Sequence, residues 1–267
     1  DLMYHYNMSP ADLIGRKTIE YYFVASDGTN ETRTEPAVIS VTGGISDEPL
    51  RLNVKELDTI RGVHTIKGTS QAVGMDASLS IDGEVLPDDS TYAALEHDAY
   101  FVFEAVNVDY YFKNAVTMGP PELEDKSILY TFMNPITSYT TLSYPIDPER
   151  LIQGDNVIYI RAGSKTSPFD ERPEENKDDF EVKNVRLLLA DGTEIWDPAY
   201  AEKEKQIKMG DSAGKSESIG FHFELKPEHL TAKAYEWDTT GISDGAHQVA
   251  LTDGQEQLTA KVMVDNT

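Results

Sequence analysis

The 267-residue chain carries 23 basic and 47 acidic residues, a formal net charge of −24, which excludes nucleic acid as a partner and disfavours anionic membrane surfaces. Cysteine is absent, so disulfides, thiol catalysis and cysteine-ligated zinc are excluded, while a hydrophobic content of 39% is enough to form folded cores. No apolar run approaches the roughly 18 residues needed to span a bilayer. Neither DLMYHYN at the start nor VDNT at the end looks like a natural terminus, so we expect the sequence to be a piece of a longer protein.

The first 44 residues hold about three predicted strands. Residues 18–41 (TIEYYFVASDGTNETRTEPAVISV) predict strand, turn and strand around Asp27-Gly28, because Asp-Gly supplies the positive φ angles of tight hairpins. A complete immunoglobulin-type sandwich has about seven strands, so we expect residues 1–44 to be the closing strands of a truncated domain. A linker is predicted at residues 42–49 (TGGISDEP), where glycine, proline and acids occur together.

Short strands continue along the rest of the chain. Residues 77–86 (ASLSIDGEVL) and 181–196 (EVKNVRLLLADGTEIW) predict two more Asp-Gly hairpins, and residues 99–116 (AYFVFEAVNVDYYFKNAV) predict an early pair of strands. The two most helix-like stretches, residues 91–98 and 199–208, are short and weakly periodic. The sequence therefore predicts an all-β fold.

Two segments far apart in the chain share the features of one kind of module. Residues 64–83 (HTIKGTSQAVGMDASLSIDG) contain a G-T-S strand and then a strand that ends in Asp-Gly. Residues 234–267 contain three further motifs: Trp237-Asp238-Thr239, Asp244-Gly245-x-His247 and Val264-Asp265-Asn266. The first segment resembles the opening half, and the second the closing half, of a bacterial immunoglobulin-like or fibronectin type III-like domain.

This resemblance implies an immunoglobulin-like β-sandwich that is split between residues 45–90 and 231–267. Residues 91–230 would then be inserted in one of its loops, which chains tolerate because loop closure entropy grows slowly with length. Neither half can bury its apolar face alone, so residues such as Ile66 and Leu79 are expected to pack against Trp237, Val249 and Val262. Three consecutive domains are the alternative that the sequence leaves open.

The stretch between the two halves has motifs of a second sandwich. Residues 151–164 contain the strand pattern GDNVIYI, and residues 178–195 place an acidic pair before an alternating run with N-V-x-L. These motifs resemble galactose-binding-like jelly rolls, the fold of many carbohydrate-binding modules. The resemblance implies a jelly-roll β-sandwich over residues 91–230, and such modules frequently carry a structural calcium ion.

The stretch KMGDSAGKSES, residues 208–218, contains G-x-S-x-G from Gly210 to Gly214. A nucleophile elbow needs a buried strand before it and a helix after it, whereas here a charged stretch precedes and a polar loop and strand follow. A phosphate-binding loop of the Walker type needs four residues between its glycines, and Gly210 and Gly214 have three. We therefore expect Ser212 to be inert and predict no catalytic residue.

An acidic run at residues 169–180 (FDERPEENKDDF) offers candidate metal ligands, because calcium prefers six to eight oxygen ligands that often come from one loop. Alternation along a strand sends adjacent side chains apart, so at most one of the last two acids is expected to point at a given ion. A solvated acidic loop is the alternative, and calcium is the one cofactor considered. The candidate ligands are Asp170, Glu174, Glu175, Asp178 and Asp179.

Aromatic side chains are candidates for sugar binding, because pyranose rings stack on the faces of tyrosine and tryptophan. Each has core or rim packing as its alternative role, and adjacent residues on a strand point to opposite faces. The candidates within the expected insert are Tyr110, Tyr111, Tyr139, Tyr144 and Trp196.

Together these patterns favour a non-catalytic accessory region of a secreted or cell-surface bacterial protein. The expected partners are a polysaccharide or cell-wall glycan and neighbouring domains of the same chain, with no nucleic acid and no membrane insertion. A spacer or adhesion stalk without a small ligand is one alternative. A second alternative is that the chain is part of a larger exported hydrolase of Gram-positive bacteria, such as a calcineurin-like metallophosphoesterase. The basis of this alternative is the domain architecture, because similar modules accompany such enzymes.

Overall fold

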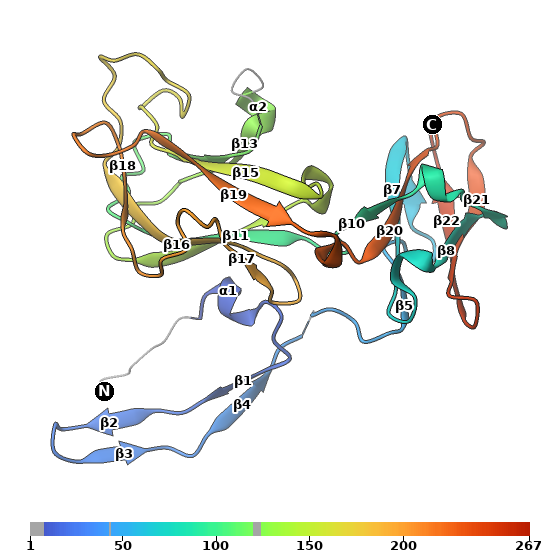
Figure 1. Ribbon diagram of the computed structural model, residues 1–267, viewed down its shortest axis with the longest axis horizontal. Coiled ribbons are helices and arrows are strands. Elements are labelled where there is room, and N and C mark those ends of the chain that lie inside the picture. The colour runs from blue at the N-terminus through green and yellow to red at the C-terminus, as the bar shows by residue number, and fades with distance from the viewer. Residues whose placement is uncertain (1–7, 43, 120–123) are drawn as a thin grey trace. The chain divides into compact units, whose positions relative to one another are not determined.

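The computed structural model describes residues 8–42, 44–119 and 124–267 (Figure 1). The protein is nearly all β and consists of several antiparallel sheets, which confirms the fold class expected from the sequence. The α-helical segments in the described part are single turns, α1 (Pro10–Leu13) and α2 (Glu124–Ser127). The chain divides into two compact units: a first unit of residues 1–45, 99–146 and 157–223, and a second unit of residues 46–98, 147–156 and 224–267.

The N-terminal part of the first unit is one long hairpin, as predicted for residues 18–41. Its arms pair β1 with β4 and β2 with β3, both antiparallel. The turn is fixed by Asp27, whose Oδ1 accepts hydrogen bonds from the backbone N–H groups of Thr29 (2.9 Å) and Asn30 (2.7 Å). These bonds to the charged form lower the pKa of Asp27 to about 2. The strands are β1 (Thr18–Tyr21), β2 (Val24–Ser26), β3 (Glu31–Arg33) and β4 (Ala37–Ser40).

The second unit is one β-sandwich made from two distant parts of the chain. Its sheets have the strand orders β10-β20-β7-β5 and β6-β22-β21-β8-β9. The residues between β10 and β20 include the whole of the inserted β-structure. The strands are β5 (Leu50–Leu52), β6 (Thr59–Ile60), β7 (Val63–Ser70), β8 (Ser78–Ile81), β9 (Glu84–Val85), β10 (Tyr92–Ala94), β20 (Ala232–Asp238), β21 (Gly245–Thr252) and β22 (Gln257–Val264), with single 3₁₀ turns at Gly74–Asp76, Asp88–Ser90, Pro148–Arg150 and Pro227–His229.

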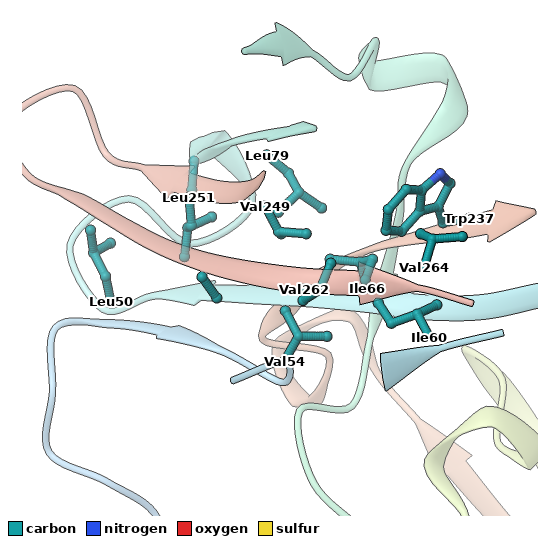
Figure 2. Packing of buried hydrophobic residues seen from close by; sticks show 12 residues of the cluster. Leu50, Val54, Ile60, Ile66, Leu79, Trp237, Val249, Leu251, Val262 and Val264 are labelled. Carbon is teal, nitrogen blue, oxygen red and sulfur yellow. The ribbon is translucent and has the colours of Figure 1, made fainter. Parts of the chain in front are cut away.

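The core of the second unit joins the early and late segments, and Figure 2 shows their side chains gathered between the strands. Ile66 and Leu79 of the early segment share one buried cluster with Trp237, Val249 and Val262 of the late segment. Burying each large apolar side chain contributes about 1.5–3 kcal/mol. The contacts that the apolar patterns predicted between the two segments are therefore present.

The compact inserted part begins at residue 99 and ends at residue 223, eight residues after and seven residues before the expected bounds of 91 and 230. Residues 92–94, within the helix-like stretch 91–98, form the edge strand β10, in which Tyr92 and Ala94 pair with Ala234 and Ala232 of β20. The compact first unit therefore resumes at residue 99 and runs to residue 223, apart from residues 147–156, which belong to the second unit. Pairing across 140 residues of sequence is a long-range contact that local propensity does not reveal.

The remainder of the first unit is a second sandwich. One sheet has the order β14-β11-β16-β17, with β18 also paired to β16, and the other has the order β13-β12-β15-β19. Its core is aromatic: the ring of Phe101 lies 5.3 Å from Phe103 and 5.9 Å from Phe223, centroid to centroid. The strands are β11 (Ala99–Val106), β12 (Ala115–Thr117), β13 (Ile128–Thr131), β14 (Thr140–Ile146), β15 (Gly154–Arg161), β16 (Phe180–Leu188), β17 (Glu194–Ile195), β18 (Ile207–Met209) and β19 (Ser218–Leu225).

Two sequence predictions for this sandwich concern its strand pairs. The hairpin at residues 181–196 is confirmed, since β16 pairs with β17 and Leu189 N donates to Thr193 O at 2.9 Å. The early pair of strands expected at residues 99–116 is present as β11 and β12, but these strands do not pair with each other. They lie in different sheets, because the ten-residue segment from Val106 to Ala115 crosses from one layer to the other.

Candidate functional site

The most exposed aromatic pair of the second sandwich lies on the crossing between β11 and β12. Tyr110 is 43% exposed and Tyr111 is 64% exposed, and their ring centroids are 4.1 Å apart at an interplanar angle of 32°. The two rings lie against each other, tilted, instead of pointing to opposite faces, because Asp109 starts a tight turn here: its Oδ1 accepts from Tyr111 N at 3.0 Å, and its carbonyl accepts from Phe112 N at 3.3 Å. We call this feature the Tyr110–Tyr111 platform.

A buried carboxylate holds the platform loop in place. Asp178 is 5% exposed, and its Oδ2 accepts from the backbone N–H of Asp109 (2.9 Å) and from Asn114 Nδ2 (2.5 Å). Burial raises the pKa of Asp178 above its ordinary value, although these hydrogen bonds oppose the shift. The side chain expected to bind calcium therefore positions the loop that carries two of the aromatic candidates.

The other end of the loop is fixed by a close backbone approach. Asn114 is fully buried, and its Oδ1 accepts from Gly163 N at 3.0 Å, while Lys113 N donates to Ser164 O at 2.8 Å. A Cβ at Gly163 would lie only 2.2 Å from Lys113 O, so glycine is required there. Anchors at both ends make the platform a rigid surface, which lowers the ordering cost of binding a ligand.

The immediate surroundings of the platform are polar and include a negative group, the Asp109 carboxylate, and a positive group, the Lys165 ammonium. Phe112 follows the platform directly in the sequence, and Lys165 Nζ lies 5.8 Å from the centroid of its ring. The pKa of Tyr110 is raised, first by its hydrogen bond with Tyr111, then by partial burial and by the carboxylate of Asp109. The Tyr110 phenol therefore stays protonated at neutral pH, and its oxygen can accept a hydrogen bond from a ligand.

The other three aromatic candidates lie elsewhere and are already engaged. Tyr144 of β14 stacks on Tyr130 at a centroid distance of 4.1 Å, and burial raises the pKa of Tyr144 to about 12. Tyr139 donates to Glu181 Oε2 at 3.0 Å, with Lys183 Nζ 4.3 Å from its ring. Trp196 donates to Glu194 Oε2 at 3.1 Å. The five candidates thus do not form one groove.

The acidic candidates do not converge on one point, and most of them have protein partners. Asp170 accepts from Ser164 Oγ (2.7 Å), from Thr166 Oγ1 (2.9 Å) and from both Nε and Nη2 of Arg172, which together hold its pKa far below the ordinary value. Glu175 pairs with the same guanidinium at 3.3 Å, and Glu174 is exposed. Within the described ranges, no three His, Cys, Asp or Glu side chains gather where they could hold a metal ion.

Asp178 and Asp179 point to different places, as alternation along the strand predicts. Ser212 Oγ donates to Asp179 Oδ2 at 2.5 Å, and Lys215 Nζ lies 3.0 Å from the same oxygen. Although desolvation would raise it, the pKa of Asp179 is lowered by these two partners. The serine of G-x-S-x-G therefore ties its loop to the start of β16.

The surroundings of this serine differ from those of a nucleophile elbow. Strand β18 precedes it and strand β19 follows, whereas an elbow turns from a strand into a helix. The loop is closed by backbone hydrogen bonds from Gly210 N to Ser216 O (2.9 Å) and from Ser216 N to Lys208 O (3.1 Å). The second predicted helix-like stretch, residues 199–208, is a turn that leads into β18.

A pocket of about 360 Å³ lies within the second unit, and the 5%-exposed Lys67 is among its lining residues. Burial lowers the pKa of Lys67, and the carboxylates of Glu149, Asp147 and Asp98 oppose that shift. Because these carboxylates outnumber the ammonium group, the pocket lacks the positive potential that would attract an anion. The Tyr110–Tyr111 platform is the stronger candidate site.

Sequence reasoning missed Asp109 and Asn114, the two residues that shape the platform. The signal for Asp109 is present in the sequence, because an aspartate before two exposed residues commonly starts an Asx turn. The role of Asn114 has no local signal, since its partners Asp178 and Gly163 lie 64 and 49 residues away.

Comparison with known proteins gives one relative over the whole chain. The chain is similar to the uncharacterized protein YvnB of Bacillus subtilis (strain 168), with 38% identity over 269 residues. The match covers 100% of this chain and 20% of that protein, so the chain spans about one fifth of the curated relative's length. No protein-family model matches the chain, and no solved structure matches it significantly. Among the described residues, no helix is long and apolar enough to cross a membrane.

Proposed function

We propose that this region is a non-catalytic glycan-binding accessory part of a larger secreted or cell-surface protein. The observation that carries the proposal is the Tyr110–Tyr111 platform, two adjacent, exposed rings, tilted by 32° to each other, on a loop anchored at both ends. Flat aromatic faces bind the C–H surfaces of sugar rings, and the Tyr110 phenol and the nearby Asp109 carboxylate supply hydrogen-bonding groups for hydroxyls.

The strand orders support the modular resemblance behind this proposal. Named A to G in chain order, the strands of the second unit form the sheets D-E-B-A and A′-G-F-C-C′, the arrangement of immunoglobulin-like sandwiches. The inserted sandwich packs two antiparallel layers over an aromatic core, in keeping with a jelly roll. A binding module inserted into a spacer module suits an accessory role in a longer chain.

The test is direct binding to glycans. Affinity electrophoresis in gels that contain soluble polysaccharides of different linkage, and pull-down on insoluble cell-wall glycan, should reveal a ligand class for the 267-residue chain. The double variant Tyr110→Ala/Tyr111→Ala should bind at least about tenfold more weakly, which corresponds to about 1.4 kcal/mol. Its melting temperature should stay unchanged, because both rings are largely exposed.

A matched control is available in the second unit. Tyr92 is 46% exposed and lies outside the platform, so Tyr92→Ala should leave glycan binding unchanged. Binding that survives the double variant would move the site elsewhere, and the absence of binding to every glycan tested would favour a spacer without a ligand.

A further inference from the structure

The N-terminal hairpin has one continuous apolar face. In the antiparallel register Ile19 lies opposite Ile39 and Tyr21 lies opposite Ala37, and residues opposite each other share a face. Phe23 continues this face, since its ring packs edge-on against Tyr21 at a centroid distance of 5.9 Å. We call these five residues the apolar hairpin face.

The opposite face of the hairpin has a different character. It carries Glu20 and Val38, which pair with each other, and Tyr22, whose ring is covered by the guanidinium of Arg33 at 3.4 Å. This face is mixed, since Val38 is 63% exposed beside the charged Glu20, whereas none of the five residues of the apolar hairpin face is charged.

The apolar hairpin face is uncovered. Phe23 is 55% exposed, Ile39 is 41% exposed and Tyr21 is 40% exposed, and no residue in the described part of the range 8–45 is buried. A two-stranded hairpin without a packed face is marginally stable in water. Side chains of this pattern therefore require a second layer that the first 45 residues do not supply.

We propose that the apolar hairpin face is the docking surface for strands of the same polypeptide that precede residue 1 in the full-length protein. With those strands, residues 18–41 complete a third β-sandwich. Two facts favour this occupant. The curated relative aligns over the whole of this chain with only 20% of its own length, so a homologous polypeptide has about four fifths of its length outside the match, on one or both sides, to supply such strands. The hairpin also begins at residue 18 and carries the apolar alternation of a sheet that packs on another sheet.

The experiment compares the 267-residue chain with a chain extended upstream by about 60 residues, since a sandwich of this type takes about 100 residues. Hydrogen–deuterium exchange of peptides that cover residues 18–41, together with binding of the dye ANS, reports whether the face is covered. In the shorter chain we expect rapid exchange and dye binding. In the extended chain the same amides should exchange about 100-fold more slowly, and dye binding should fall.

Matched variants locate the effect on one face. Tyr21→Thr/Phe23→Thr should abolish the protection in the extended chain, whereas Tyr22→Thr on the opposite face should preserve it. The proposal is overturned if the extension leaves exchange at residues 18–41 unchanged. It is also overturned if the shorter chain gains protection as its concentration rises and sediments as a dimer, because a second copy would then be the occupant.

Discussion

Replacing Gly210 by alanine should destabilise the first unit much more than the same replacement at Gly214, four residues along the same loop. Both glycines have positive φ angles, +131° and +79°. A Cβ at Gly210 would lie 1.9 Å from Asp179 Oδ1 and 2.8 Å from Asp178 O, whereas a Cβ at Gly214 would have no atom within 4 Å. The pair therefore separates backbone strain from steric overlap.

The magnitude follows from these distances. Gly214→Ala adds only the left-handed backbone strain of an L-residue, about 1–2 kcal/mol. Gly210→Ala adds at least as much backbone strain, since φ +131° lies farther from the left-handed region, and it also displaces the Asp179 carboxylate from Ser212 and Lys215, because a contact at 1.9 Å must open by more than 1 Å. Charge-assisted hydrogen bonds contribute about 1.5–3 kcal/mol when buried and less when partly exposed, as here. We expect Gly210→Ala to cost about 3–5 kcal/mol in total.

The two tryptophans of the chain make the assay specific to each unit. Trp196 lies in the first unit and Trp237 in the second, so Trp237→Phe leaves one reporter of the first unit and Trp196→Phe leaves one of the second. Urea unfolding followed by fluorescence should show the Trp196 transition shifted strongly by Gly210→Ala and weakly by Gly214→Ala. Equal shifts for the two variants, or a shift in the Trp237 transition, would refute the steric argument.

Three further outcomes are expected. Ile66→Ala should lower the free energy of unfolding of the second unit by about 2–5 kcal/mol, read from Trp237, because it opens a cavity in the shared core. Burial lowers the pKa of Lys67 in the folded state below its unfolded value of 10.5. Between the folded and unfolded pKa values the unfolded state binds more protons, so the free energy of unfolding should rise with pH there. Lys67→Met should remove this rise. Calcium at fixed ionic strength should leave the melting temperature unchanged, because the carboxylates of residues 169–180 that point inward already accept protein hydrogen bonds; a shift specific to calcium would show a metal site.

The turns and the strand alternation were predictable from the sequence because they depend on neighbouring residues. Asp82 and Gly83 adopt φ angles of 52° and 84°, as the Asp-Gly hairpin between β8 and β9 requires. The pattern GDNVIYI becomes β15, in which Asn156, Ile158 and Ile160 are buried. The joining of residues 60–86 to residues 234–265 was also accessible, because each segment has an apolar face that it cannot bury alone.

The parts that sequence reasoning missed depend on contacts between distant residues. Nothing local assigns β11 and β12 to different sheets, since both are short apolar strands. Asp178 looks like its acidic neighbours in sequence, and only the approach of Asp109 and Asn114 distinguishes it as the residue that fixes the platform loop. Likewise, the contact of Tyr110 with Tyr111 contradicts strand alternation, and the turn at Asp109 explains why.

The insertion between β10 and β20 has a mechanical consequence. These strands are hydrogen-bonded neighbours, with Tyr92 opposite Ala234, so they close the base of the loop that carries residues 99–223. Tension applied to the chain before β5 and after β22 is transmitted through the second unit. There, β6 and β22 run parallel, with Ile60 opposite Val264, so the pull shears their hydrogen bonds together instead of opening them one at a time. The residues that carry the Tyr110–Tyr111 platform are under no tension until β10 and β20 separate, so a stretched chain would keep the platform folded.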